Sequence, residues 1–187
     1  MTPLSAFFKL GYRLFNDTPE KFPVPFIEGD ILNRAFLDVV PPVYKQSEVQ
    51  GPTPDLTKLT TLTPLAGRLT AIHISMVFHL FMEDKQLQLA HALAGLLAPT
   101  PGAMIFGWHS GEVEKGFMTG AKLPNGNSVP IFCHCPESWK ELWDGQVFEK
   151  GTVDVKAELL PLATDTSGTQ LPAGTKVWQL VWSMTHL

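Results

Sequence analysis

The sequence predicts an α/β protein in which a largely parallel sheet is completed by an antiparallel pair of strands near the C-terminus. The first indication is the order of patterns through residues 5–108, which runs helix, strand, loop, strand, helix, strand. The second is a pair of alternating segments, residues 152–162 and 176–187, separated by polar residues. Of the 187 residues, 44% are apolar and 17% charged, which suits one domain, residues 1–187, with its own core.

The N-terminal part contains a predicted helix, a strand and a loop. Residues 5–15 return apolar side chains to one broad face at helical spacing, so we expect a helix there. Residues 23–32, PVPFIEGDIL, predict a short strand that ends at Gly29 and Asp30. Residues 41–57 combine proline, glycine and polar residues without periodicity, which predicts a loop.

The middle of the chain predicts a helix, a strand, a second helix and a second strand. Residues 56–66 favour a helix, and residues 68–75, RLTAIHIS, favour a buried strand rich in β-branched side chains. Residues 76–97 carry a helical pattern that Pro99 and the residues after it stop. Residues 102–108, GAMIFGW, predict another buried strand.

The C-terminal part changes character. Residues 138–148 predict a helix that carries two tryptophans. Residues 164–174 are a polar hairpin loop between the two alternating segments, which we expect to pair and to close one edge of the sheet.

Charge and hydropathy exclude several classes of protein. The formal net charge is -4, and the 14 lysines and arginines are scattered, so nucleic acid is not the expected partner. No stretch reaches the roughly 18 uncharged apolar residues that span a bilayer. Lys9 and Arg13 interrupt the apolar start, and no small-residue cleavage site follows, so we expect no signal peptide. These observations predict a cytoplasmic protein without a membrane span.

Metal binding is not expected. Cys133 and Cys135 are the only cysteines, too close for an unstrained disulfide and without a second ligand pair at finger-like spacing. We interpret them as reduced thiols. His73 falls inside a predicted strand and His79 on the following helix, so they lack the spacing of paired helical ligands. We expect His73 to be a buried, hydrogen-bonded residue and His79 to face a ligand.

Ligands of α/β sheets bind beyond the carboxyl ends of parallel strands, so the residues after each strand are the first candidates for a site. Polar residues that follow the predicted strands include Asp30, Ser75, His79 and His109. From its local pattern, Asp30 suits either a hydrogen bond to a ribose hydroxyl or exocyclic amine, or the cap of a helix. No nucleophile elbow, phosphate-binding loop or metalloprotease motif occurs in the sequence.

Six segments, taken in order, resemble the methyltransferases of fungal meroterpenoid and related natural-product pathways: LSAFFKLGYRLFND, FIEGDIL, LAGRLTAIHISMVFHLF, LLAPTPGAMIFGWHSG, PESWKELW and WQLVWSM. These are class I enzymes that use S-adenosylmethionine (SAM), and the resemblance runs over nearly the whole chain. It implies an incomplete Rossmann-like sheet in which the strands ending near Asp30, Ser75 and Trp108 are the third, fourth and fifth of the family and run parallel. It also implies methyl transfer to a carboxylate or hydroxyl of a hydrophobic small molecule.

The resemblance also implies roles for single residues. Five match positions that contact SAM, the first two beside the adenine and the others along its methionine part: Asp30, Ile31, Ile74, Ser75 and Met76. The candidate catalytic residues are His79, which would face the cofactor or the acceptor, and His134, which would lie on the substrate side.

Compared with that family, the chain lacks the first strand, its glycine-rich turn and the acidic residue after the second strand. The family's sheet order is 3-2-1-4-5-7-6, so the missing strands lie between those that end at Asp30 and Ser75. From this difference we expect either a truncated gene product or a short protein with altered function. Its function is either SAM-dependent methyl transfer or, without catalysis, the binding of a hydrophobic metabolite or a partner subunit. A homo-oligomer is compatible with both.

Overall fold

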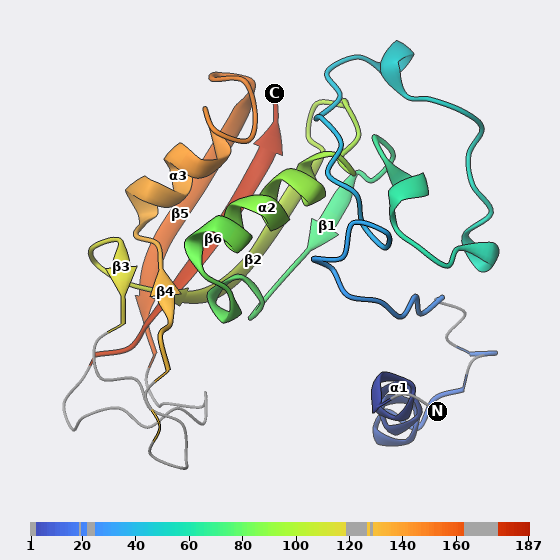
Figure 1. Cartoon of the computed structure of the whole chain (residues 1–187), viewed down its shortest axis with the longest axis horizontal. Coiled ribbons are helices and arrows are strands. Elements are labelled where there is room, and N and C mark those ends of the chain that lie inside the picture. The colour runs from blue at the N-terminus through green and yellow to red at the C-terminus, as the bar shows by residue number, and fades with distance from the viewer. Residues whose placement is uncertain (1–2, 19, 22–24, 119–126, 128, 163–175) are drawn as a thin grey trace. The chain divides into compact units, whose positions relative to one another are not determined.

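The computed structural model describes residues 3–18, 20–21, 25–118, 127, 129–162 and 176–187 (Figure 1). The chain divides into two compact units. The first contains residues 1–38 and 51–65, and the second contains residues 39–50 and 66–187. The expectation of a single domain stays a prediction.

The first unit is built around helix α1, Pro3–Leu14, which confirms the helix expected over residues 5–15. Phe26 packs against this helix, with ring centroids 4.3 Å from Phe8 and 5.7 Å from Tyr12. Together these aromatic rings supply the apolar contact that a short helix needs, because propensity alone does not hold 12 residues helical in water.

The strand expected over residues 23–32 is absent from its described part, residues 25–32, which is irregular. Local hydrogen bonds explain the difference. Asp30 Oδ1 accepts the N–H of Leu32 at 2.9 Å, and Asn33 Oδ1 accepts the N–H of Ala35 at 3.0 Å. Such side-chain bonds compete with a strand ladder for the same backbone groups. The parallel third strand of the predicted sheet is therefore wrong for these residues.

The helix expected over residues 56–66 is also wrong. Only two 3-10 turns form there, Leu56–Lys58 and Thr63–Leu65. Asp55 caps the first turn by accepting the N–H of Thr57 at 3.0 Å. Residues 41–57 are irregular as predicted, apart from a short 3-10 turn, Gln46–Glu48, and the start of the turn at Leu56.

The second unit contains a mixed sheet with the order β1-β2-β6-β5. The bounds of its strands are Ala71–His73 (β1), Met104–Gly111 (β2), Val153–Pro161 (β5) and Trp178–His186 (β6). β1 and β2 are parallel, whereas β6 is antiparallel to both of its neighbours, β2 and β5. The parallel pair and the C-terminal antiparallel pair are confirmed. The polar loop expected over residues 164–174 lies outside the described residues.

Two helices lie on one face of this sheet, α2 (Glu83–Ala94) and α3 (Pro136–Trp143) (Figure 1). The helix predicted over residues 76–97 therefore begins late. A 3-10 turn, Phe78–Leu80, precedes it, and Phe81 is extended. A two-stranded hairpin, β3 (Gly116–Phe117) with β4 (Phe132–Cys133), completes the unit among the described residues.

Alternation along the strands divides the sheet into two faces. The inner face, toward α2 and α3, carries the buried side chains of β2 and β6, which include Ile105, His109, Leu180, Trp182 and Met184. The outer face carries half-buried or exposed side chains, among them His73, Phe106 and Trp108. His73 is therefore not the buried histidine that the strand pattern predicts, because β1 presents it on the outer face.

Within the part of the chain that the structure describes, no helix has both the length and the apolar character needed to cross a bilayer.

Candidate functional site

Beyond its carboxyl end, the backbone of β1 continues to contact β2 at close range. Ile74 continues the parallel pairing by donating its N–H to the carbonyl of Phe106 at 3.0 Å. The chain then crosses close to Gly107, where a β-carbon would overlap the backbone carbonyl of Ile74. Glycine at this position thus allows the backbone of β1 to approach that of β2.

Ser75 and Met76 hold this crossing in place. The hydroxyl of Ser75 accepts the N–H of Trp108 at 3.2 Å and lies 2.8 Å from His73 Nε2. Met76 has a φ of 58°, in the left-handed region, and donates its N–H to the carbonyl of Trp108 at 2.7 Å. A left-handed conformation at a non-glycine residue costs about 1–2 kcal/mol, so the surrounding hydrogen bonds must maintain it.

We predict that Ser75→Ala lowers the free energy of unfolding of the second unit by about 1 kcal/mol, because the Trp108 N–H loses its acceptor. Urea unfolding followed by tryptophan fluorescence measures the change. Ser110→Ala is the matched control, because Ser110 is a half-buried serine of β2, the strand that also carries Trp108. An equal effect of the two substitutions would contradict a structural role for the Ser75 hydroxyl.

His79 lies on the 3-10 turn after the β1 exit, with only 8% of its surface exposed. Its Nδ1 has no hydrogen-bond partner among the described residues. Burial lowers the pKa of His79 below its ordinary value, so the ring is neutral at physiological pH and able to accept a proton.

His134 directly precedes the cap residue of α3 and is 2% exposed. Its Nδ1 lies 2.9 Å from Ser138 Oγ, which also contacts the N–H and the carbonyl of Cys135, each at 3.1 Å. Burial, followed by the nearby positive charge of Lys115, lowers the pKa of His134 to about 4. The side chain is thus a neutral, anchored imidazole.

His134 belongs to a buried group of rings, which we name the aromatic cluster: Phe78, His109, His134, Trp139, Trp143 and Trp182. Trp139 is central, with its ring centroid 4.6 Å from that of His109 and 5.2 Å from that of His134. Phe78, Trp139 and Trp143 are fully buried, which favours core packing over contact with a substrate.

The predicted SAM-contacting residues fall into both units. Ile74, Ser75 and Met76 lie together at the β1 exit, in the same unit as His79 and His134. Asp30 and Ile31 belong to the first unit. Asp30 is exposed and forms a local turn by accepting the N–H of Leu32. This bond resembles that of a helix cap, the alternative expected from the sequence, although no helix follows Asp30.

Two further polar residues inside the second unit were given no role from the sequence. His109 was expected just after a strand, but it lies within β2 and projects to the inner face, and its alternation with Ile105 is the signal that places it there. Gln86, fully buried on α2, donates from Nε2 to the carbonyls of Phe81 and Phe132, both at 2.9 Å. It ties the start of α2 to the hairpin strand β4.

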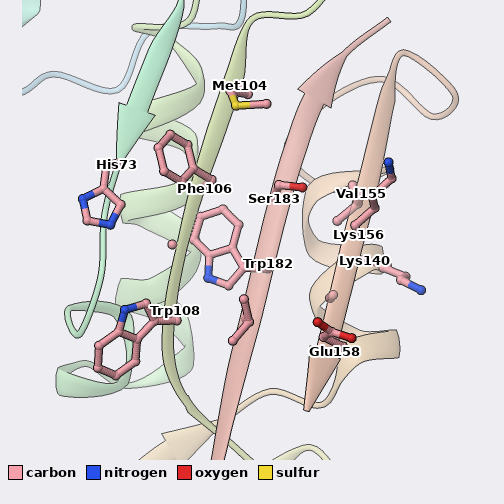
Figure 2. A pocket seen from close by; sticks show the side chains of 13 residues that line it. His73, Met104, Phe106, Trp108, Lys140, Val155, Lys156, Glu158, Trp182 and Ser183 are labelled. Carbon is pink, nitrogen blue, oxygen red and sulfur yellow. The ribbon is translucent and has the colours of Figure 1, made fainter. Parts of the chain in front are cut away.

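The outer face of the sheet contains a shallow groove of about 840 Å³. Figure 2 shows His73 of β1 and Phe106 and Trp108 of β2 along one part of it, with Lys156 and Glu158 of β5 along another. The groove is thus lined by aromatic rings on β2 and by the charged side chains of Lys156 and Glu158 on β5.

In the described ranges, no three His, Cys, Asp or Glu side chains gather closely enough to hold a metal ion. Cys133 is buried, and burial raises the pKa of its thiol to about 12, so it is not a thiolate at neutral pH.

Comparison with known proteins gives a consistent result. The chain is 29% identical over 148 residues to O-methyltransferase phiE of a fungal species, covering 76% of this chain and 48% of phiE. It is 28% identical over 147 residues to methyltransferase adrK of Penicillium rubens, covering 78% of this chain and 42% of adrK.

A third relative, methyltransferase trt5 of Aspergillus terreus, is 25% identical over 138 residues, which cover 74% of this chain and 40% of trt5. No protein-family model matches the chain. The chain spans less than half the length of these curated relatives. Over about three quarters of its own length, this protein is similar to fungal proteins named as methyltransferases.

Proposed function

We propose that the chain takes part in SAM-dependent methyl transfer to an oxygen of a hydrophobic secondary metabolite, with a carboxylate or hydroxyl of a meroterpenoid as the acceptor. The observation that carries this proposal is the similarity to several proteins named as methyltransferases, one of them as an O-methyltransferase. The sheet order β1-β2-β6-β5 supports it, because strands four, five, seven and six have this order in the family that the sequence resembles.

The residues proposed to contact SAM are compatible with its chemistry. Asp30 is an exposed carboxylate, and a carboxylate accepts several hydrogen bonds, as a ribose hydroxyl or an adenine amine requires. Ile31 would contact the adenine ring. Ile74, Ser75 and Met76 would lie along the methionine part, where the left-handed Met76 turns the chain at the strand end.

Bound SAM would supply a methyl group on a positively charged sulfur for a single in-line displacement. The protein's part is alignment and the exclusion of water, which such a reaction needs more than an elaborate set of acids and bases. An ionised carboxylate acceptor needs no base. For a hydroxyl acceptor, the neutral ring of His79 is the proposed base, and His134 is the proposed residue on the substrate side.

Calorimetric titration of the whole chain with SAM tests the proposal. We expect saturable binding, weakened by about tenfold or more in Asp30→Asn, because a hydrogen bond to a charged group contributes about 1.5–3 kcal/mol. Asp17→Asn is the matched control, since Asp17 is a second carboxylate of the first unit that accepts a local N–H, from Thr18 at 2.8 Å.

No heat at near-millimolar SAM, from a sample shown to be folded by circular dichroism, would overturn the proposal. It would favour the alternative of a non-catalytic protein that binds a hydrophobic metabolite or a partner subunit. Equal weakening by the Asp30 and Asp17 substitutions would remove Asp30 from the proposed site.

A further inference from the structure

The aromatic cluster contains polar ring atoms that are buried without a protein partner. Within the described residues, these include His109 Nε2, His134 Nε2 and Trp139 Nε1. The three side chains are each 2% exposed or less. A buried polar atom without a hydrogen bond costs about 1–3 kcal/mol, so three such atoms on rings that contact one another require an explanation.

The protonation of His109 is fixed by its neighbour on β6. Trp182 donates its indole N–H to His109 Nδ1 at 3.1 Å, inside the core. Because an indole nitrogen only donates, Nδ1 must carry the lone pair, and the proton of the neutral ring lies on Nε2. Burial, followed by the neighbouring rings of His79 and His134, lowers the pKa of His109 to about 3 and keeps the ring neutral. His109 Nε2 is therefore a buried donor.

The protonation of His134 follows from the balance of donors and acceptors. Trp139 Nε1 is a second buried donor beside the same rings. If the hydroxyl of Ser138 donates to the carbonyl of Cys135 at 3.1 Å, it accepts from His134 Nδ1 at 2.9 Å. His134 Nε2 is then an acceptor. The opposite tautomer of His134, with its proton on Nε2, would add a third buried donor without an acceptor to those at His109 Nε2 and Trp139 Nε1.

We propose that one water molecule is bound inside the aromatic cluster, where it accepts hydrogen bonds from His109 Nε2 and Trp139 Nε1 and donates one to His134 Nε2. Three hydrogen bonds are the usual number for a buried water. The resulting chain of hydrogen bonds runs from Trp182 on β6, through His109 on β2 and the water, to His134 and Ser138 at the start of α3. It joins the helix to the two central strands.

Imidazole nitrogen NMR on protein with ¹⁵N-labelled histidine tests the tautomers in the unmodified chain. At neutral pH we expect His109 to show a protonated Nε2 and a bare Nδ1, and His134 to show the reverse. A proton on His109 Nδ1 or on His134 Nε2 overturns the proposal.

The water itself is tested by cross-relaxation between solvent and the Nε2 proton of His109. We expect a slowly exchanging proton with a direct cross-peak to water. A slowly exchanging proton without this cross-peak overturns the water site. A rapidly exchanging proton also overturns it, because an Nε2 proton buried in this core should be shielded from bulk solvent.

Trp182→Phe removes the donor to His109 Nδ1, and we expect His109 to lose its single tautomer. Trp143→Phe is the matched control, because Trp143 is a buried tryptophan of the same cluster whose Nε1 makes no hydrogen bond in the described structure. In Trp143→Phe, the tautomer of His109 should be the same as in the unmodified protein. If either variant fails to fold, the measurements on the unmodified protein still decide the proposal.

Discussion

Replacement of Gly107 by alanine is expected to lower the free energy of unfolding of the second unit by more than about 3 kcal/mol. The added methyl group would overlap the carbonyl of Ile74, which is backbone and cannot rotate aside. Relief of the overlap would separate β1 from β2 and weaken the bonds of Ile74 and Met76 to β2. Overpacking in a core costs typically 1–3 kcal/mol, and a backbone clash lies at or above that range.

Urea unfolding of Gly107→Ala, followed by tryptophan fluorescence, measures this loss, since the fluorescence reports on the aromatic cluster of the same unit. Gly11→Ala is the control, because a β-carbon at Gly11 in helix α1 meets nothing within 4 Å. It should stabilise that helix by up to about 1 kcal/mol and leave the fluorescence transition unchanged. A Gly107→Ala protein as stable as the unmodified chain would show that β1 does not cross β2 at this point.

The second large effect is expected from acid. The pKa of His109 is lowered to about 3 and that of His134 to about 4, in both cases mainly by burial, from an ordinary value of 6.5. As the pH falls below about 6.5, the unfolded chain binds protons at both rings while the folded protein does not. The free energy of unfolding therefore falls with pH, by up to about 1.4 kcal/mol per pH unit for each histidine.

Urea titrations at several pH values between about 7 and 5 measure this slope. The titrations are not extended to more acidic pH because of Glu112. Burial raises the pKa of Glu112 from 4.5, so its protonation stabilises the folded protein and opposes the effect of the histidines. His134→Gln should reduce the slope by up to about 1.4 kcal/mol per pH unit, the contribution of this one ring. An unfolding midpoint independent of pH in the unmodified protein would contradict the burial of these rings as neutral groups.

Sequence patterns predicted the helices and strands in which buried side chains recur at regular spacing along the chain. Strands β2, β5 and β6 and helices α1 and α3 were all expected near their observed positions, because alternation and helical spacing describe a side chain's burial relative to its own element. Patterns failed over residues 25–32 and 56–66, where Asp30, Asn33 and Asp55 bond to backbone N–H groups two residues ahead and so favour turns.

For the candidate site, the sequence identified the β1 exit but not its geometry. The cluster Ser75, Met76 and His79 was expected after a strand, and it lies there. The resemblance to fungal methyltransferases was confirmed by similarity to several of them. The roles of Asp30, Ile31, Ile74, Ser75, Met76, His79 and His134 stay predictions.

The sequence by itself determined that the protein is of mixed α/β type and where most of its strands and helices lie, because both follow from local order and periodicity. Only the tertiary structure decided which distant residues share one environment. The indole of Trp182 and the ring of His109 are 73 positions apart and meet in the core, where the bond between them fixes the tautomer of His109. Likewise, Gly107 permits the crossing of Ile74 only because β1 and β2 are neighbours. Such contacts depend on how strands pair across the sheet, and that pairing has no signature in the spacing of residues along the chain.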